Sequence, residues 1–152
     1  MAEAEMYKGS CLCGHVTFKA RGASEGNIAC YCTQCQKNSG STHQIASATP
    51  IRQQPLTKTA RTSPTTSRVA TFSLANMTVS DPQNSIKIWN VPGESCSSGL
   101  PKEKVFCGNC GCTLWTIPAA LKGKGQYVRT SLFDGGLTNE KLKPTMEIFK
   151  TA

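Results

Sequence analysis

The sequence has few aromatic and charged residues and contains no long apolar run. Aromatic residues make up 7% and charged residues 17% of its 152 residues, and histidine occurs only twice. No stretch approaches the roughly 18 consecutive apolar residues of a membrane-spanning helix. The acidic N-terminus lacks the apolar segment of a secretory signal, and heptads and longer repeats are absent. We therefore expect one cytoplasmic domain over residues 1–152 that has no membrane partner.

Basic residues outnumber acidic ones, which gives a formal net charge of +8. Residues 49–68, rich in Thr and Pro, carry four basic residues and no acidic one. We interpret this segment as an exposed loop, because it offers little apolar surface to bury; a basic arm that binds anions is the alternative. The other basic residues are scattered, and no helix-turn-helix or RNA-binding motif is present, so we expect no nucleic-acid partner.

Short alternating runs typical of β-strands dominate the pattern. They cover residues 15–20, 85–89 and 126–130, and further candidates are 69–74, 105–106 and 113–117. Clusters of Gly, Pro, Asn and Ser separate them. Helical patterns are confined to a turn or two after Cys32 and to residues 138–142. The sequence predicts a mainly β domain of antiparallel strands, with Trp89 and Trp115 as core aromatics.

Seven of the nine cysteines fall into three clusters, over residues 11–13, 30–35 and 107–110, and Cys112 follows the third cluster closely. A Cys-x-x-Cys turn supplies two thiolates to a tetrahedral zinc ion, whereas Cys-x-Cys pairs close poor disulfide rings. Cytosolic thiols also stay reduced, which favours metal binding. The natural division of seven ligands is one complete four-cysteine site and one three-cysteine site with an open position. Spacing alone does not decide which clusters combine.

Three motifs resemble a known family. The motifs that carry the resemblance are Gly9-Ser10-Cys11-Leu12-Cys13-Gly14, residues 30–41 and Phe106-Cys107-Gly108-Asn109-Cys110-Gly111, together with residues 132–134 and 143–149. Through these motifs the sequence resembles the glutathione-dependent formaldehyde-activating enzyme family. That family shares its zinc domain with centromere protein V. The resemblance implies an Mss4-like fold of packed antiparallel sheets with few short helices. It also implies two Zn²⁺ per chain: a structural zinc on Cys11, Cys13, Cys107 and Cys110, and a catalytic zinc on Cys30, Cys32 and Cys35.

The resemblance further implies a carbon–sulfur lyase-type enzyme. Its substrate would be an adduct of a thiol, such as glutathione, and a reactive carbonyl compound. In one version of this hypothesis, the reaction is a tailoring step in small-molecule metabolism. Tyr31 and Gln36 stand where the family commonly has His and Arg, so glutathione specificity does not follow. The alternative is a non-enzymatic zinc module for protein or chromatin interaction. The sequence leaves open whether the chain is a monomer or a homodimer.

Several residues near the clusters are candidates for catalysis or substrate binding. His43 is the best-placed proton-transfer group, and Tyr31 lies between two ligands and could donate a hydrogen bond. Cys112 could be a fourth ligand or a nucleophile. Packing or surface roles are the alternative for each. A substrate carboxylate could bind to Lys37, Ser39, Gly40 and Ser41, although polar turn residues often only face solvent.

Overall fold

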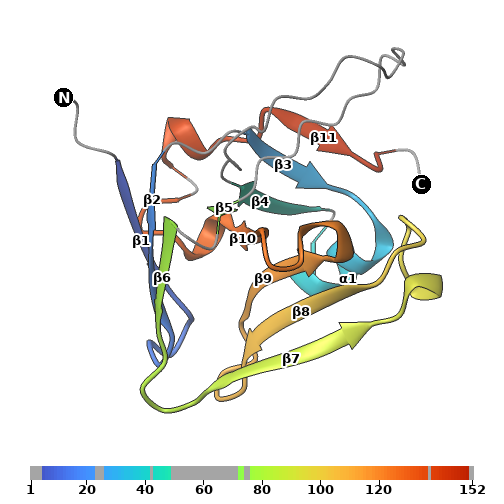
Figure 1. Ribbon diagram of the computed structural model, residues 1–152. Coiled ribbons are helices and arrows are strands. Elements are labelled where there is room, and N and C mark those ends of the chain that lie inside the picture. The colour runs from blue at the N-terminus through green and yellow to red at the C-terminus, as the bar shows by residue number, and fades with distance from the viewer. Residues whose placement is uncertain are drawn as a thin grey trace, which may run out of the picture.

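The computed structural model describes residues 5–22, 26–41, 43–48, 72–73, 76–136 and 138–150. Two β-sheets make up most of this part of the chain (Figure 1). The loop expected over residues 49–68 lies outside the described residues. Within them, no helix is long and apolar enough to cross a membrane.

The smaller sheet has three antiparallel strands in the order β1-β2-β6. Its strands are β1 (Met6–Ser10), β2 (Thr17–Arg21) and β6 (Met77–Ser80). Buried and exposed residues alternate along β1 and β2, which places Tyr7, Phe18 and Ala20 on one face. That face packs against the larger sheet.

The larger sheet has the order β11-β3-β4-β10-β9-β8-β7, and β5 pairs with β10 beside this path. Its strands are β3 (Gly26–Cys30), β4 (Gln44–Ala48), β5 (Phe72–Ser73), β7 (Ile86–Val91), β8 (Lys102–Cys107), β9 (Thr113–Pro118), β10 (Gly125–Arg129) and β11 (Met146–Ile148). The described pairs are antiparallel except β11 with β3, which is parallel. The predicted packing of antiparallel sheets is thus confirmed, with one parallel pair at an edge.

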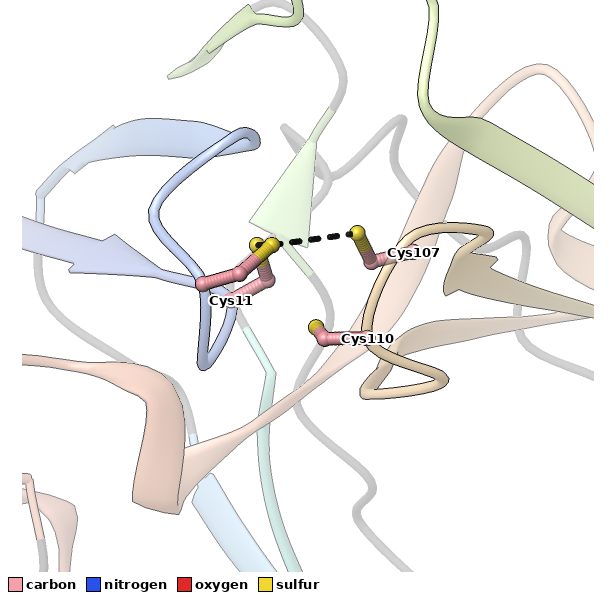
Figure 2. Close-up of side chains that lie close together, drawn as sticks. Cys11, Cys107 and Cys110 are labelled. Carbon is pink, nitrogen blue, oxygen red and sulfur yellow. Dashed lines mark hydrogen bonds between the residues drawn. The ribbon is translucent and has the colours of Figure 1, made fainter.

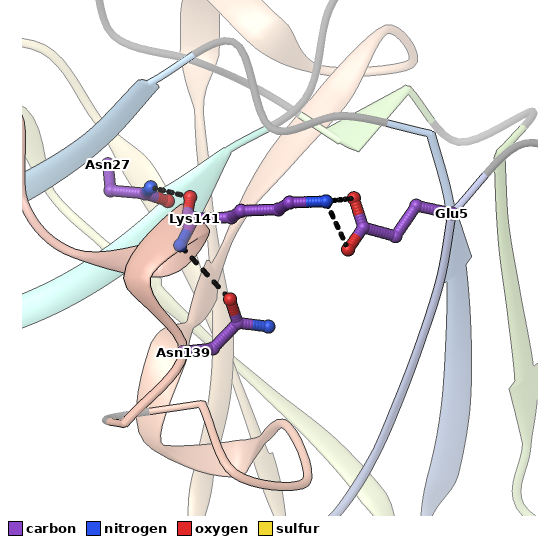
Figure 3. A network of polar contacts seen from close by, with 4 residues as sticks. All are labelled: Glu5, Asn27, Asn139 and Lys141. Atoms are coloured by element: carbon purple, nitrogen blue, oxygen red, sulfur yellow. Dashed lines mark hydrogen bonds and ion pairs between the residues drawn. The ribbon is translucent and has the colours of Figure 1, made fainter.

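Helices are few, as the sequence predicts. The α-helix α1 (Thr33–Ser39) follows Cys32, and short 3₁₀ turns are η2 (Gly93–Ser95), η3 (Ala119–Leu121), η4 (Thr130–Leu132) and η5 (Glu140–Leu142). Asn139 caps η5 by accepting a hydrogen bond from the Lys141 amide at 3.0 Å. The Lys141 side chain pairs with Glu5 at 2.9 Å, and its carbonyl accepts from Asn27, so η5 joins the two sheets (Figure 3).

The core lies between the two sheets. The Phe18 ring meets Trp115 and Phe133 edge to face, with ring centres 5.9 and 5.5 Å apart. Trp115 is buried, as predicted, but the prediction for Trp89 was wrong, since its side chain is 57% exposed. The reason is position, because β7 is the edge strand of its sheet and few elements cover it.

Candidate metal centres and pocket

Two loops bring four cysteine sulfurs together. Cys11 and Cys13 follow β1, while Cys107 and Cys110 lie on the β8–β9 turn, and Figure 2 shows Cys11 facing Cys107 and Cys110 across the gap. All four sulfurs lie within 4.8 Å of one another, with 3.5 Å from Cys11 to Cys13 and 3.8 Å from Cys13 to Cys107. Four thiolates around one zinc ion stand about 3.8 Å apart, because Zn–S bonds are about 2.3 Å long. The four-cysteine group therefore fits a tetrahedral zinc ion.

Local backbone geometry aims these sulfurs. Gly14 and Gly111 follow the second cysteine of each loop with φ of 77° and 72°, a region that only glycine adopts at low cost. The Cys107 amide bonds to the Cys112 carbonyl at 2.9 Å, which closes the second loop. Hydrogen bonding from Asn109, and then from the backbone of His15, lowers the pKa of Cys13 to about 6. This thiolate is therefore present at neutral pH.

The second group has three cysteines. Cys30 ends β3, Cys32 caps the N-terminus of α1 and Cys35 lies in its first turn, and their sulfurs lie within 4.8 Å of one another. Hydrogen bonding with Cys30 and Cys35 lowers the pKa of Cys32, whereas hydrogen bonding with Cys30 and Cys32 raises the pKa of Cys35. The opposed shifts show that the three sulfurs interact strongly with one another. A cation is the simplest partner for such a group, and three close thiols match a zinc site with one free position.

This three-cysteine group opens into a pocket of about 510 Å³. Side chains alternate across a strand, so the larger sheet has two faces. Val105, Cys107 and Val128 point to the core, and Lys104 and Tyr127 beside them point to the pocket. The pocket therefore lies on the face of the larger sheet opposite the core.

Two buried cations near the three-cysteine group were missed by sequence reasoning. Lys104 is only 5% exposed and lines the pocket, and Arg129 is partly buried nearby. Desolvation lowers the pKa of each, and nearby cysteine sulfurs oppose that shift: Cys35 at Lys104, and Cys112 and then Cys35 at Arg129. The sequence pattern of β8 predicts that Lys102 and Lys104 share one face of the strand and that Val105 and Cys107 share the other. It did not reveal that this face is covered.

Tyr31 and His43, the residues predicted to assist proton transfer, contact each other and do not line the pocket. The rings of Tyr31 and His43 stack with centres 4.9 Å apart. The Tyr31 hydroxyl donates to Glu147 at 2.7 Å, and its pKa is raised by that contact. Neither ring belongs to the pocket lining, since the neighbouring residues Cys30, Cys32 and Gln44 take the pocket side.

The predicted carboxylate-binding residues lie around the C-terminus of α1. Lys37, Gly40 and Ser41 are exposed, while the Ser39 hydroxyl lies 2.8 Å from the Cys35 carbonyl and 3.1 Å from that of His43. Ser39 therefore closes the turn between α1 and β4. None of the four belongs to the pocket lining.

The two remaining cysteines belong to neither sulfur group. Cys112 packs against the core, and desolvation raises the pKa of its thiol. Cys96 is buried and its sulfur donates to the Pro92 carbonyl at 3.4 Å. Gln34 of α1 approaches the same sulfur at 3.9 Å and donates to the Ser95 carbonyl, which connects α1 and the three-cysteine group to the rim of the pocket.

Comparisons with known proteins agree with this arrangement. A crystal structure of a Rhodobacter sphaeroides protein from a structural-genomics programme superposes over 92% of this chain and 98% of its own, with a TM-score of 0.53. At 16% identity, that likeness shows the fold alone. No match was found among curated proteins. The family profile described as glutathione-dependent formaldehyde-activating enzyme matches residues 6–73 and 59–152, and the chain belongs to this family.

Proposed function

We propose that the chain is a zinc-dependent enzyme of the carbon–sulfur lyase type. Its substrate would be an adduct between a thiol and a reactive carbonyl compound, glutathione being one such thiol. The observation that carries the proposal is that the three-cysteine group opens into the pocket, whereas the lining contains none of the four-cysteine group. A zinc site with three protein ligands keeps a position for substrate, and a closed four-ligand site does not.

Three parts of the site would have separate roles: the cysteines would hold the metal, the apolar lining would exclude water, and Tyr127 would donate a hydrogen bond. A zinc ion held by Cys30, Cys32 and Cys35 would supply a site for the substrate sulfur and stabilise it as a thiolate. Apolar side chains, among them Ile28, Leu100 and Ile148, line the pocket and exclude water from the bound adduct. Tyr127 also lines the pocket, and burial raises the pKa of its hydroxyl to about 12, so the group stays protonated and would be able to donate a hydrogen bond.

Substitution of a ligand in the three-cysteine group tests the proposal. In Cys35→Ser, turnover of S-hydroxymethylglutathione should fall by more than about 100-fold, since changes to residues behind a metal ligand alone cost about 10–100-fold. Far-UV circular dichroism should be unchanged, because the four-cysteine group still joins the two sheets. Metal analysis should show the loss of one zinc per chain.

Cys96→Ser is the matched control, since Cys96 is a buried thiol outside both groups. It should keep both zinc ions and its turnover. Full turnover by Cys35→Ser would contradict the proposal, and so would a fourth protein ligand that closes the second zinc site.

A further inference from the structure

Lys102 and Lys104 form a short cationic strip on the pocket side of β8. They lie two residues apart on one strand, so their side chains point the same way with bases about 7 Å apart. Lys104 is only 5% exposed, and Lys102 is half-buried nearer the rim. Burial of an ammonium group costs several kcal/mol unless it is paired, so the strip calls for an explanation.

The described residues do not provide Lys104 with a carboxylate partner. The ion pairs found among them involve other lysines: Lys122, Lys141, Lys143 and Lys150. Glu147 is the single acidic residue in the pocket lining, and it is engaged by Lys150 at 2.5 Å and by the Tyr31 hydroxyl. With the Asn38 amide turned to the orientation that satisfies its neighbours, its oxygen lies 3.1 Å from Lys104 Nζ and also faces Arg129, so the partner of Lys104 is a neutral group.

The three-cysteine group does not balance this charge either. Three thiolates and one Zn²⁺ carry a single formal negative charge, which Arg129 and Lys104 both face. With Lys102, three positive charges stand against that one negative charge. The Nε of Arg129 is also buried without a hydrogen-bond partner in the described part of the chain. The side of the pocket formed by Lys102 and Lys104 therefore carries more positive charge than the described residues balance, with Arg129 adding to it from outside the lining.

The rest of the pocket is mostly apolar. Leu100 and Pro101 lie at one side of it, Pro118 and Ala119 follow β9, and Phe149 follows β11. A ligand that fits both features has an apolar body and one anionic group. Glutathione offers a polar peptide with two carboxylates and an ammonium group, which suits this wall poorly.

We infer that the pocket selects a thiol, or its carbonyl adduct, that bears one carboxylate on an apolar chain, and that Lys104 and Lys102 bind the carboxylate. This inference rests on the proposed function, since it places the sulfur of the same molecule at the three-cysteine group. Lys102 and Lys104 are specificity-determining residues in this arrangement. The lysine strip sets which thiol binds, and the cysteines hold the metal.

The test compares 6-mercaptohexanoate with its neutral counterpart 6-mercaptohexanol by calorimetric titration of the zinc-loaded protein. Because a hydrogen bond to a charged group contributes about 1.5–3 kcal/mol, the acid should bind roughly 10–100-fold more tightly than the alcohol. Lys104→Met, which removes the ammonium group and shortens the side chain by one atom, should abolish that preference by weakening binding of the acid more than binding of the alcohol. Glutathione should bind more weakly than 6-mercaptohexanoate.

Two further variants control for fold and metal. Lys19→Met removes an exposed lysine of the smaller sheet and should keep the preference for the acid. Lys102→Met changes a half-buried side chain near the rim and should reduce the preference even if Lys104→Met proves unstable. If Lys104→Met lost zinc and Lys102→Met kept the full preference, the lysines would serve the metal cluster, and the inference would be overturned.

The outcomes separate this inference from the proposed function. Equal affinity of the wild-type protein for acid and alcohol overturns the inference and leaves thiol binding at the cysteines intact. Undiminished affinity of Cys35→Ser for both thiols overturns the proposed function. A preference for the acid that still depends on Lys104 in Cys35→Ser supports the anion site by itself.

Discussion

At the scale of single residues, His43 is the clearest case in which chain position and spatial position differ. It lies eight positions after Cys35, yet its ring stacks on Tyr31 and its neighbour Gln44 takes the place in the pocket. General acid–base catalysis contributes about 10²–10⁴-fold. We expect His43→Ala to lower kcat/KM by less than that range, because the ring lies outside the pocket lining.

Steady-state kinetics on a thiol adduct over pH 5 to 9 measures this effect. Lys37→Ala, an exposed change on the neighbouring helix, is the control. A loss of 100-fold or more in His43→Ala, with a pH profile that has lost one ionisation, would instead assign His43 to proton transfer.

The grouping of the cysteines could be predicted from sequence, but the burial of the lysine could not. Seven thiols occur in short clusters whose spacing already suits a zinc ion, so no tertiary information is needed to identify them. Lys104 is different, since a lysine that alternates with valine is typical of a strand with one face in water. Its burial depends on residues far along the chain, such as Cys35 and Ile148, that enclose the same pocket.

At the scale of elements, β1 and β2 depend on a glycine at their contact with the rest of the fold. Gly9 is paired with Phe18, and a Cβ at Gly9 would lie 2.6 Å from both the Phe18 ring and the Leu132 carbonyl oxygen. The carbonyl is backbone and cannot move aside cheaply. We expect Gly9→Ala to lower the free energy of unfolding by about 1–3 kcal/mol, as overpacked sites do.

Urea denaturation of the zinc-loaded protein measures this change, with Lys8→Ala as the control on the exposed face of the same strand. Stability of Gly9→Ala equal to that of Lys8→Ala would show that Phe18 and the η4 backbone adapt, and the close contact would then carry no cost.

The strands differ in how far the sequence predicts them. Alternation located β2, β7, β9 and β10, and in all of these except the edge strand β7 one apolar face meets the core. It did not locate β3 and β4, whose sequences Gly-Asn-Ile-Ala-Cys and Gln-Ile-Ala-Ser-Ala mix small and polar residues. These two strands pair with each other, and β11 joins β3 from the far end of the chain. Such strands are stabilised by partners that no local pattern reveals.

At the scale of the whole molecule, the four-cysteine group links the two sheets. Cys11 and Cys13 extend from the smaller sheet, and Cys107 and Cys110 belong to the larger one. The hydrophobic core between the sheets is modest, since hydrophobic residues make up 38% of the chain. A metal ion held across this junction would therefore contribute folding free energy directly, whereas one in the three-cysteine group would contribute mainly to binding.

Metal removal should consequently proceed in two stages. A chelator should first take one zinc per chain from the three-ligand site, and the fluorescence of the buried Trp115 should not change. The second zinc should leave more slowly and together with unfolding, which exposes Trp115.

Acidification should release the two zinc ions in the same order, because protons compete with the metal for each thiolate and zinc affinity falls as pH falls. A colorimetric zinc indicator recorded alongside tryptophan fluorescence resolves the stages, and Cys35→Ser should show only the second. Release of both ions in one step with unfolding would mean that the three-cysteine group also holds the fold together.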